Sequence, residues 1–310
     1  MHIRTNPKLN VIFRPVILFC EWLGEHHPIF LVKIRYFARF KKLLNLDNPQ
    51  TLNEKILFLC LKTDTALWTR CADKYAVRGF VEEKGLGDIL IPLIGVWNKV
   101  TDIDFDKLPK EFVLKATHGS GDNLVVKDKS KLNWPQVVDV FKKDLAKRYG
   151  ALESGHHYMR IVPRMIAEEL IHNDEETQKL SSSLIDYKMW CFNGKCHYIW
   201  ACANRDEHST EVMTYDREWN AHPEYSIFED GYRHGEILPK PKNLEHMIKI
   251  AEKLSEDFPC VRVDLYNVGG KIYFGELTFT SYGGLQDFYT DEFQLLAGSK
   301  IDLSRVKTIR

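Results

Sequence analysis

Two acidic side chains late in the sequence have the spacing of a metal site. In VRVDLYNVGGKIYFGELTF, polar and apolar residues alternate on both sides of the turn at 267–270. Side chains two apart on a strand share a face, so Arg262 lies beside Asp264, and Glu276 lies beside Thr278. We expect the Gly-Gly turn to bring Glu276 opposite Asp264. Oxygen ligands on one face would suit Mg²⁺; the alternative is a solvent-facing hairpin that carries two acids by chance.

A lysine followed by a small-residue loop could bind phosphate. In EFVLKATHGSGDNLVVKD an apolar strand ends at Lys115, and Gly119, Ser120 and Gly121 follow before a second strand. Glycines let backbone N–H groups approach phosphate oxygens, and the lysine adds a mobile positive charge. The loop is neither a Walker loop nor a dinucleotide fingerprint, since GxxxxGK[ST] and GxGxxG are both absent. A plain turn is the alternative.

Two further strands carry charged residues. In RMIAEELI an apolar strand is followed by Glu168 and Glu169. Their carboxylates could accept hydrogen bonds from an adenine amino group or ribose hydroxyls. The alternative is a strand end that reaches solvent. In DYKMWCFNGK, Lys188 shares a face with Asp186. A lysine among aromatic neighbours must either extend to water or meet an anion.

These residues are carried by helices and hairpins without regular βαβ alternation, which predicts an α+β fold. Thr51 and Glu54 form a capping box at the start of one helix. We expect further helices at 28–44, 66–85, 134–148 and 243–258. We expect strands within 88–97, 111–128, 164–171, 186–203, 211–216 and 261–279.

Composition excludes several classes of protein. The 310 residues are 44% apolar, which suits a folded protein. Lys plus Arg and Asp plus Glu both number 43, so the chain is not a polycation for nucleic acid. Seven cysteines without a CxxC pair favour reduced thiols in a cytoplasm. No apolar run reaches the roughly 18 residues of a spanning helix.

The amino-terminal region is basic. Residues 1–45 hold eight Lys and Arg but two Glu, and 28–44 reads as a basic amphipathic helix. Such a helix either docks on its own domain with a solvated basic face or lies on anionic lipid. We therefore keep peripheral membrane contact through 11–44 as a second interpretation beside docking.

Three other functions compete. Asp102, Asp104 and Asp106 have the DxD spacing of a glycosyltransferase metal site, although they stand in a polar connector where turn-forming aspartates are expected. A sugar or polymer kinase could use the same nucleotide site, and a non-catalytic binding protein is the third. Zinc binding is not favoured, because the spacing lacks the paired ligands of structural sites. The residues in question are Cys191, Cys196, His197 and Cys202.

Taken together, the segments resemble the ATP-grasp superfamily, and in detail its TupA-like branch, named for teichuronopeptide synthesis. The resemblance covers about 46–285 in order. It rests on NPQTLNEKI (48–56), DKYAVR (73–78), IPLIGVW (91–97), FVLKATHGSG (112–121), IAEELI (166–171), DYKMWCFNGK (186–195) and FPCVRVDLYNVGGKIYFGELTF (258–279).

The resemblance implies a domain organisation and a role for each matched residue. It implies a helical amino-terminal region (1–45), a short leading subdomain (46–110), a nucleotide and lid subdomain (111–180) and a metal and substrate subdomain (181–310). ATP would be bound by Arg78, Lys115, Gly119, Ser120, Gly121, Glu168, Glu169, Leu170, Ile171 and, for its ribose, Glu175. Lys188 and Arg262 would act on the transferred phosphoryl group and the oxyanion, and Mg²⁺ would be held by Asp264, Glu276 and Thr278. Many members have Asn at the last of these positions, and a hydroxyl is a weaker neutral ligand than an amide oxygen.

The activity implied is ATP-dependent ligation of a carboxylate to an amine through an acyl phosphate. The TupA-like branch implies assembly of a bacterial surface polysaccharide, with a sugar, polymer or lipid-linked acceptor. The protein would be cytoplasmic, with a possible position at the inner face of the membrane. Several aromatic residues could stack on sugar rings, although core packing is favoured for most of them: Tyr158, Trp200, Trp219, Tyr232 and Tyr282.

Overall fold

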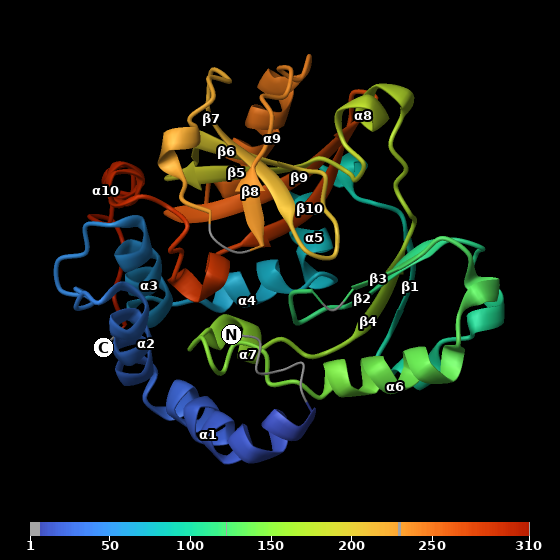
Figure 1. Ribbon diagram of the computed structural model, residues 1–310, viewed down its shortest axis with the longest axis horizontal. Helices are drawn as coiled ribbons and strands as arrows, with labels where there is room; N and C mark the ends of the chain where they lie inside the picture. Colours follow the sequence, from blue (N-terminus) through green and yellow to red (C-terminus); the bar gives the residue numbers. More distant parts are fainter. Residues whose placement is uncertain (1–6, 122, 229–230, 310) are drawn as a thin grey trace.

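The computed structural model describes residues 7–121, 123–228 and 231–309, with side chains described from residue 14 onward. Two sheets organise the chain (Figure 1). The smaller sheet is antiparallel, in the order β1-β4-β2-β3, with β1 (Leu93–Trp97), β2 (Phe112–Ala116), β3 (Asn123–Val126) and β4 (Met165–Glu168). The larger sheet has the order β10-β9-β5-β6-β7-β8, with β5 (Asp186–Phe192), β6 (Lys195–Ala203), β7 (Thr210–Asp216), β8 (Tyr232–His234), β9 (Cys260–Val268) and β10 (Lys271–Thr278).

Helices cover and connect these sheets. They are α1 (Pro7–His26), α2 (Pro28–Phe40), α3 (Leu52–Lys62), α4 (Ala66–Ala72), α5 (Ala76–Glu83), α6 (Trp134–Leu145), α7 (His156–Met159), α8 (Glu175–Leu180), α9 (Leu244–Ser255) and α10 (Asp291–Ser299). Short 3₁₀ turns are η2 (Gly87–Ile89), η3 (Val100–Asp102), η4 (Phe105–Lys107), η5 (Lys129–Lys131), η6 (Pro223–Tyr225) and η7 (Ser281–Gly284). In Figure 1, α4 and α5 lie between the two sheets and α6 lies beside the smaller sheet. Helix α1 forms the lower edge and α2 lies at the left edge, below α3.

Each sheet has its own apolar core. The larger core joins α9 to one face of the six-stranded sheet and includes Met247, Ile248 and Val263, all fully buried. The smaller core packs α6 on β2 around Phe112 and Phe141. Separate cores let each sheet hold its polar face rigidly toward the space between them.

Several expected elements have the predicted position. The capping box opens α3: Thr51 Oγ1 accepts the Glu54 N–H at 3.2 Å, and Glu54 Oε2 accepts the Thr51 N–H at 3.1 Å. The hairpin after β9 turns at Gly269 and Gly270, whose φ angles are 59° and 81°. Positive φ is the conformation that glycine tolerates without steric cost, so the Gly-Gly pair fixes this turn.

Other elements differ from expectation. The helix expected over 66–85 is two helices, because Asp73 Oδ1 accepts the N–H groups of Tyr75 and Ala76 (2.8 and 3.2 Å) and so starts α5 anew. Within 88–97 the strand is β1, and the start of that segment belongs to the 3₁₀ turn η2. The smaller sheet also crosses the boundary expected between 46–110 and 111–180, because β1 pairs with β4.

Candidate active site

A cleft of about 740 Å³ lies between the two sheets. Its walls come from β2, β4 and the loop after β2 on one side, and from β5, β9 and β10 on the other. The apolar part of its lining includes Ala72, Leu90, Ile91, Phe274 and Leu277. The rest of the lining is dominated by charged and polar side chains, so the cleft suits a ligand with one apolar part and one strongly charged part.

On the smaller sheet, one carboxylate holds two cations toward the cleft. Lys115 Nζ lies 2.6 Å from Glu168 Oε2, and Arg78 Nη1 lies 3.0 Å from Glu168 Oε1. All three side chains are largely buried. β2 supplies the lysine and the adjacent strand β4 supplies the glutamate, while α5 carries the arginine from the other side. Glu168 thereby orients Lys115, which the sequence predicted to bind phosphate, and Arg78, which the resemblance assigned to ATP.

The glycine-containing loop between β2 and β3 forms the next part of the wall. Gly119, Ser120 and Gly121 all line the cleft. Lys74 donates a hydrogen bond to the Gly119 carbonyl, which ties this loop to the segment before α5. At Gly121 φ is +81°, and a Cβ there would have no neighbour within 4 Å. Because these residues line the cleft, the backbone of the loop is accessible to a ligand there.

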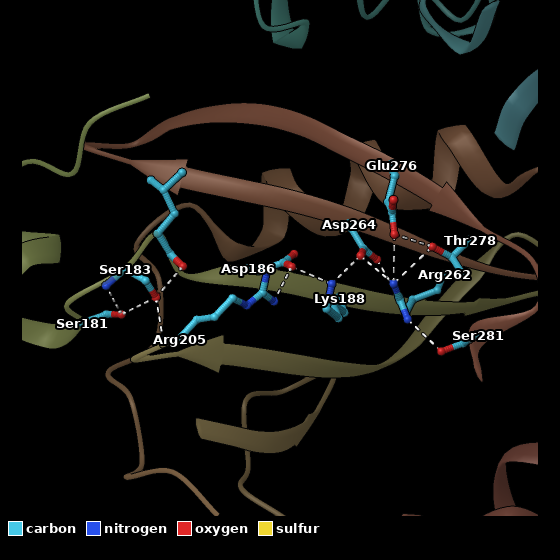
Figure 2. A network of polar contacts seen from close by, with 11 residues as sticks. Ser181, Ser183, Asp186, Lys188, Arg205, Arg262, Asp264, Glu276, Thr278 and Ser281 are labelled. Atoms are coloured by element: carbon cyan, nitrogen blue, oxygen red, sulfur yellow. Dashed lines mark hydrogen bonds and ion pairs between the residues drawn. The ribbon is translucent and has the colours of Figure 1, made fainter. Parts of the chain in front are cut away.

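On the larger sheet, side chains of β5, β9 and β10 form a continuous row of alternating charge, which we call the charged row (Figure 2). Its members are Asp186, Lys188, Asp264, Arg262 and Glu276. Lys188 Nζ lies 2.5 Å from both Asp186 Oδ2 and Asp264 Oδ2. Arg262 donates from Nε to Asp264 Oδ1 and from Nη2 to Asp264 Oδ2, both at 2.7 Å, and its Nη2 lies 3.3 Å from Glu276 Oε1.

The ends of the charged row are fixed by further hydrogen bonds. Thr278 Oγ1 accepts from Arg262 Nη2 at 3.1 Å and donates to Glu276 Oε1 at 2.8 Å. Arg262 Nη1 donates to Ser281 Oγ at 2.8 Å. At the other end, Arg205 Nη2 lies 3.4 Å from Asp186 Oδ2. Because each charge touches its opposite, the row can stay ionised although most of it is buried.

These contacts shift the pKa values of Lys188, Arg262 and Asp264 toward their charged forms. Burial alone would lower the pKa of Lys188, but Asp186 and Asp264 outweigh it and raise that pKa well above the ordinary value. Burial likewise opposes the charge on Arg262, whose pKa Asp264 raises. For Asp264, burial is outweighed by Arg262 and Lys188, which lower its pKa. Lys188 therefore acts as a fixed cation and not as a proton acceptor.

A bulge in β10 brings the two acids together. From the turn, residues pair one for one as far as Phe274 with Leu265, and then the register shifts so that Glu276 pairs with Asp264. A regular hairpin would place Gly275 there instead. A Cβ at Gly275 would lie 2.9 Å from the Asp264 carbonyl oxygen, so the bulge needs glycine. The expected pairing is confirmed, but its cause is this extra residue.

The oxygen ligands at this end of the charged row suit an open Mg²⁺ site, in which phosphate and water complete the coordination, better than a site closed by protein ligands alone. Among the described residues, no three His, Cys, Asp or Glu side chains are grouped to hold a metal. Asp264 and Glu276 face each other with Thr278 beside them, and the Glu276 side chain is 41% exposed. Mg²⁺ is usually bound by one or two carboxylates together with phosphate oxygens and water. The site therefore fits an ion that arrives with a phosphate ligand.

The structure brings most predicted site residues to one cleft. Its lining includes Arg78, Lys115, Gly119, Ser120, Gly121, Glu168, Lys188, Arg262, Asp264, Glu276 and Thr278. It does not include Glu169, Leu170, Ile171 or Glu175. The chain leaves β4 at Glu168, so Glu169 is exposed, and Glu175 begins α8, which Asp174 caps.

The cleft lining also tests the predictions for the aromatic residues and for the three aspartates of the connector. Tyr158, Tyr232 and Tyr282 line the cleft, whereas Trp200 and Trp219 are 3% and 8% exposed in the core and do not. Asp102, Asp104 and Asp106 also lie outside the lining, and Asp104 pairs with Lys107 at 2.9 Å. This placement removes the support for a DxD metal site.

Sequence reasoning missed two parts of the site. Arg205 follows β6 in a connecting loop, where nothing in the local pattern marks it, yet it lines the cleft and ends the charged row. Asp186 was noticed for its spacing from Lys188 but was given no role. Alternation on β5 was the signal available for Asp186, since both residues share the cleft face.

Comparisons with known proteins identify this fold. A family model described as TupA-like ATPgrasp matches residues 54–302. The L-amino acid ligase from Bacillus licheniformis has a similar structure, with a TM-score of 0.50 and 14% identity over 93% of this chain and 64% of its own. The D-alanine–D-alanine ligase from Bacillus anthracis is also similar, with a TM-score of 0.45 and 17% identity over 77% of this chain and 66% of its own.

This chain thus spans about two thirds of the length of these two ligases. Among curated proteins, none has a significantly similar sequence. The family match extends over most of the chain and includes both sheets and the whole charged row. The chain belongs to the TupA-like ATP-grasp family and has the α+β fold of the ATP-grasp superfamily.

Proposed function

We propose that this chain is an ATP-dependent carboxylate–amine ligase that acts through an acyl phosphate. In this proposal it joins an amine or amino acid to a uronic acid or peptide carboxylate during assembly of a bacterial surface polysaccharide. One observation carries the proposal: the Lys115–Glu168–Arg78 cluster and the charged row face one cleft from two different sheets.

The cleft provides a place for each part of ATP. The apolar lining around Leu90, Ile91 and Leu277 suits the base. Lys115 and Arg78 would bind the α- and β-phosphates, and the loop at 119–121 would cover them with backbone N–H groups. Lys188 and Arg262 would face the γ-phosphate from the other sheet.

The charge of the row indicates why a metal is needed. The charged row has three carboxylates (Asp186, Asp264 and Glu276) and two cations (Lys188 and Arg262). Arg205 at its end brings the sum to zero, so this wall adds no net positive charge. Asp264, Glu276 and Thr278 would hold Mg²⁺. When bound, the ion would neutralise phosphate oxygens and lower the barrier to phosphoryl transfer.

The reaction then needs positioning more than covalent catalysis by the protein. The substrate carboxylate attacks the γ-phosphorus and ADP leaves, which gives an acyl phosphate. The free amine attacks its carbonyl carbon, phosphate leaves, and one proton is released. Arg262 can stabilise the oxyanion of this second step, because charge-assisted hydrogen bonds strengthen as negative charge develops. The loop over the phosphates would keep water from the intermediate.

Product analysis with a panel of uronic acids and amino acids tests the proposal. We expect ADP and phosphate in equal amounts when both a carboxylate and an amine are present. Hydroxylamine in place of the amine should give a hydroxamate, which reports the acyl phosphate. ADP with a phosphorylated sugar would instead identify a kinase, and consumption of a nucleotide sugar without ATP would identify a glycosyltransferase. Either result would overturn the proposal.

A further inference from the structure

Helix α2 is apolar on two opposite faces. Leu31, Val32 and Tyr36 are buried on its inner face. On the other side Phe30, Ile34 and Phe37 follow the i, i+4, i+7 spacing and are 57%, 48% and 51% exposed. A surface helix normally buries its apolar stripe and presents polar residues to water. The second stripe therefore has no partner within the described part of the chain.

Helix α1 extends this apolar surface. Val16, Leu18, Phe19 and Trp22 are 58%, 53%, 58% and 44% exposed, and the rings of Phe19 and Trp22 stack at 6.0 Å. In Figure 1, α1 lies along the lower edge of the molecule and α2 follows it at the left edge, below the six-stranded sheet. We call the exposed side chains of 16–22 together with those of 30–37 the outer face.

The exposed charged side chains of residues 14–44 are all positive, whereas the two acids in that range, Glu21 and Glu25, are half-buried. Arg14, Lys33 and Lys41 are exposed, and neither Arg14 nor Lys33 has an ion-pair partner among the described residues. The acid Glu25 is already paired with Arg148. Within 1–45 eight basic residues stand against two acidic ones, while the chain as a whole is neutral.

We propose that the outer face binds the surface of a bilayer that contains anionic phospholipids. Tryptophan and phenylalanine partition into the headgroup region, and lysine and arginine beside them meet lipid phosphates. Among the described residues, no helix combines the length and the hydropathy of a membrane span, so these helices would lie along the surface. A second copy of the chain fits less well, because a shared face would bring two clusters of positive charge together.

Arg35, on the side of α2 away from the outer face, connects this helix to the candidate active site. Arg35 lies between Ile34 and Tyr36 on α2, lines the cleft, and donates to the Leu152 carbonyl at 2.5 Å. The backbone near α1 is also fixed to the segment around Leu152, because His156 Nε2 lies 2.9 Å from the Gly24 carbonyl. Membrane binding by the outer face would hold this end of the cleft beside the lipid surface.

Vesicle flotation of the full chain tests the proposal without any measure of activity. The vesicles contain phosphatidylcholine alone or phosphatidylcholine with phosphatidylglycerol. We expect the protein to float with the anionic vesicles and to stay unbound with the neutral ones. Phe30→Ser with Phe37→Ser should lower the partition coefficient by about tenfold or more, and Lys33→Ala by about fivefold.

Val140→Ser with Leu295→Ser is the matched control, because these side chains are 48% and 52% exposed elsewhere on the surface and should not affect flotation. Circular dichroism checks that each variant is folded. Absence of flotation with anionic vesicles would overturn the proposal. So would a concentration-dependent dimer, seen by sedimentation, that the Phe30→Ser, Phe37→Ser variant abolishes while flotation is unchanged. Flotation does not depend on catalysis, so this test remains valid even if the protein proves not to be a ligase.

Discussion

Two carboxylates of the charged row differ in how freely they can bind a metal. Asp264 accepts from Arg262 on both oxygens and from Lys188 on one, and it is buried. Glu276 is 41% exposed on its side chain, and its hydrogen bonds are made by one oxygen. Removing the charge of Asp264 would leave two buried cations short of a partner, so stability and activity would change together. Glu276 offers the cleaner test.

We predict that Glu276→Gln lowers kcat by about 10² or more while the melting temperature changes little. The magnitude is that of losing one essential electrostatic group. The half-saturating Mg²⁺ concentration should rise as well, because an amide is a weaker ligand than a carboxylate. Steady-state kinetics across a Mg²⁺ titration measures both effects.

Asp139→Asn is the control for this substitution, since Asp139 is exposed on α6 and lies outside the cleft lining. It should leave kcat and the Mg²⁺ dependence as in the wild type. Ordinary turnover by the Glu276→Gln variant would show that the hairpin acid is not a metal ligand.

His157 makes the folded state sensitive to acid. Its ring is buried against Trp68 and Phe279, and neither ring nitrogen has a hydrogen-bond partner among the described residues. Burial, with smaller contributions from Arg160 and His156, lowers the pKa of His157 from 6.5 to about 3. Below pH 6.5 the unfolded chain takes up a proton here that the folded chain accepts only near pH 3, so stability falls over this window as the pH is lowered.

We predict that His157→Phe removes this part of the acid sensitivity. Between pH 7.5 and pH 5, proton uptake by the unfolded imidazole should cost the wild type about 2 kcal/mol of unfolding free energy that the variant keeps. Urea unfolding at the two pH values measures the difference. Equal losses in both proteins would mean that the imidazole is protonated in the folded state.

At the scale of elements, close contacts decide how the amino-terminal helices dock. A Cβ at Gly24 would lie 1.7 Å from the Ala151 carbonyl oxygen, so α1 can approach this backbone only through glycine. At Gly79 on α5 the nearest atom is Arg70 Nη2 at 3.4 Å, the mobile end of a side chain. The same substitution should therefore have opposite effects at the two positions.

We predict that Gly24→Ala destabilises the docking of α1 and speeds proteolytic cleavage within it, although alanine is the better helix former. Gly79→Ala should stabilise the protein by about 0.5–1 kcal/mol, since it gains helix propensity without a clash. Limited proteolysis and thermal unfolding measure the two effects. If Gly24→Ala were as stable as the wild type, α1 would not be held by this contact.

Local sequence signals predicted the elements that are closed by short-range chemistry. The capping box of Thr51 and Glu54 and the Gly269-Gly270 turn both depend on residues within four positions of each other. The break after α4 was missed because helical periodicity runs through it, and it is made by the side chain of Asp73. The pairing of β1 with β4 was missed because it joins segments far apart in the sequence.

The same distinction applies to the site. Alternation on β9 and β10 placed Arg262, Asp264 and Glu276 on one face, and the structure confirms it. Alternation could not show that Glu168 pairs with Lys115 and Arg78, since that contact depends on how β2, β4 and α5 pack. The outcome for the aromatic side chains also depended on packing: Trp200, in an apolar strand, lies in the core, whereas Tyr232, in a short polar strand, lines the cleft.

At the scale of the whole molecule, the Lys115–Glu168–Arg78 cluster and the charged row lie on separate sheets with separate cores. Lys115 belongs to the smaller sheet and Glu276 to the larger one, and neither group contacts the other in the ion pairs of the described residues. A nucleotide that binds both sheets must therefore stabilise the folded molecule as a unit. If the nucleotide bound only one sheet, substitutions on the other sheet would not change the stabilisation that it gives.

We predict that a non-hydrolysable ATP analogue with Mg²⁺, at 100 times its Kd, raises the unfolding free energy by about 2.7 kcal/mol. Lys115→Met and Glu276→Gln should each reduce this increment at the same ligand concentration, although they lie on different sheets. Lys115→Met also deprives Glu168 of a partner, but that cost is present with and without ligand and cancels in the increment. The double variant should show coupling, because one ligand bridges both positions. An increment that survives Lys115→Met would mean that the smaller sheet takes no part in nucleotide binding, and thermal unfolding with and without the analogue decides between the two outcomes.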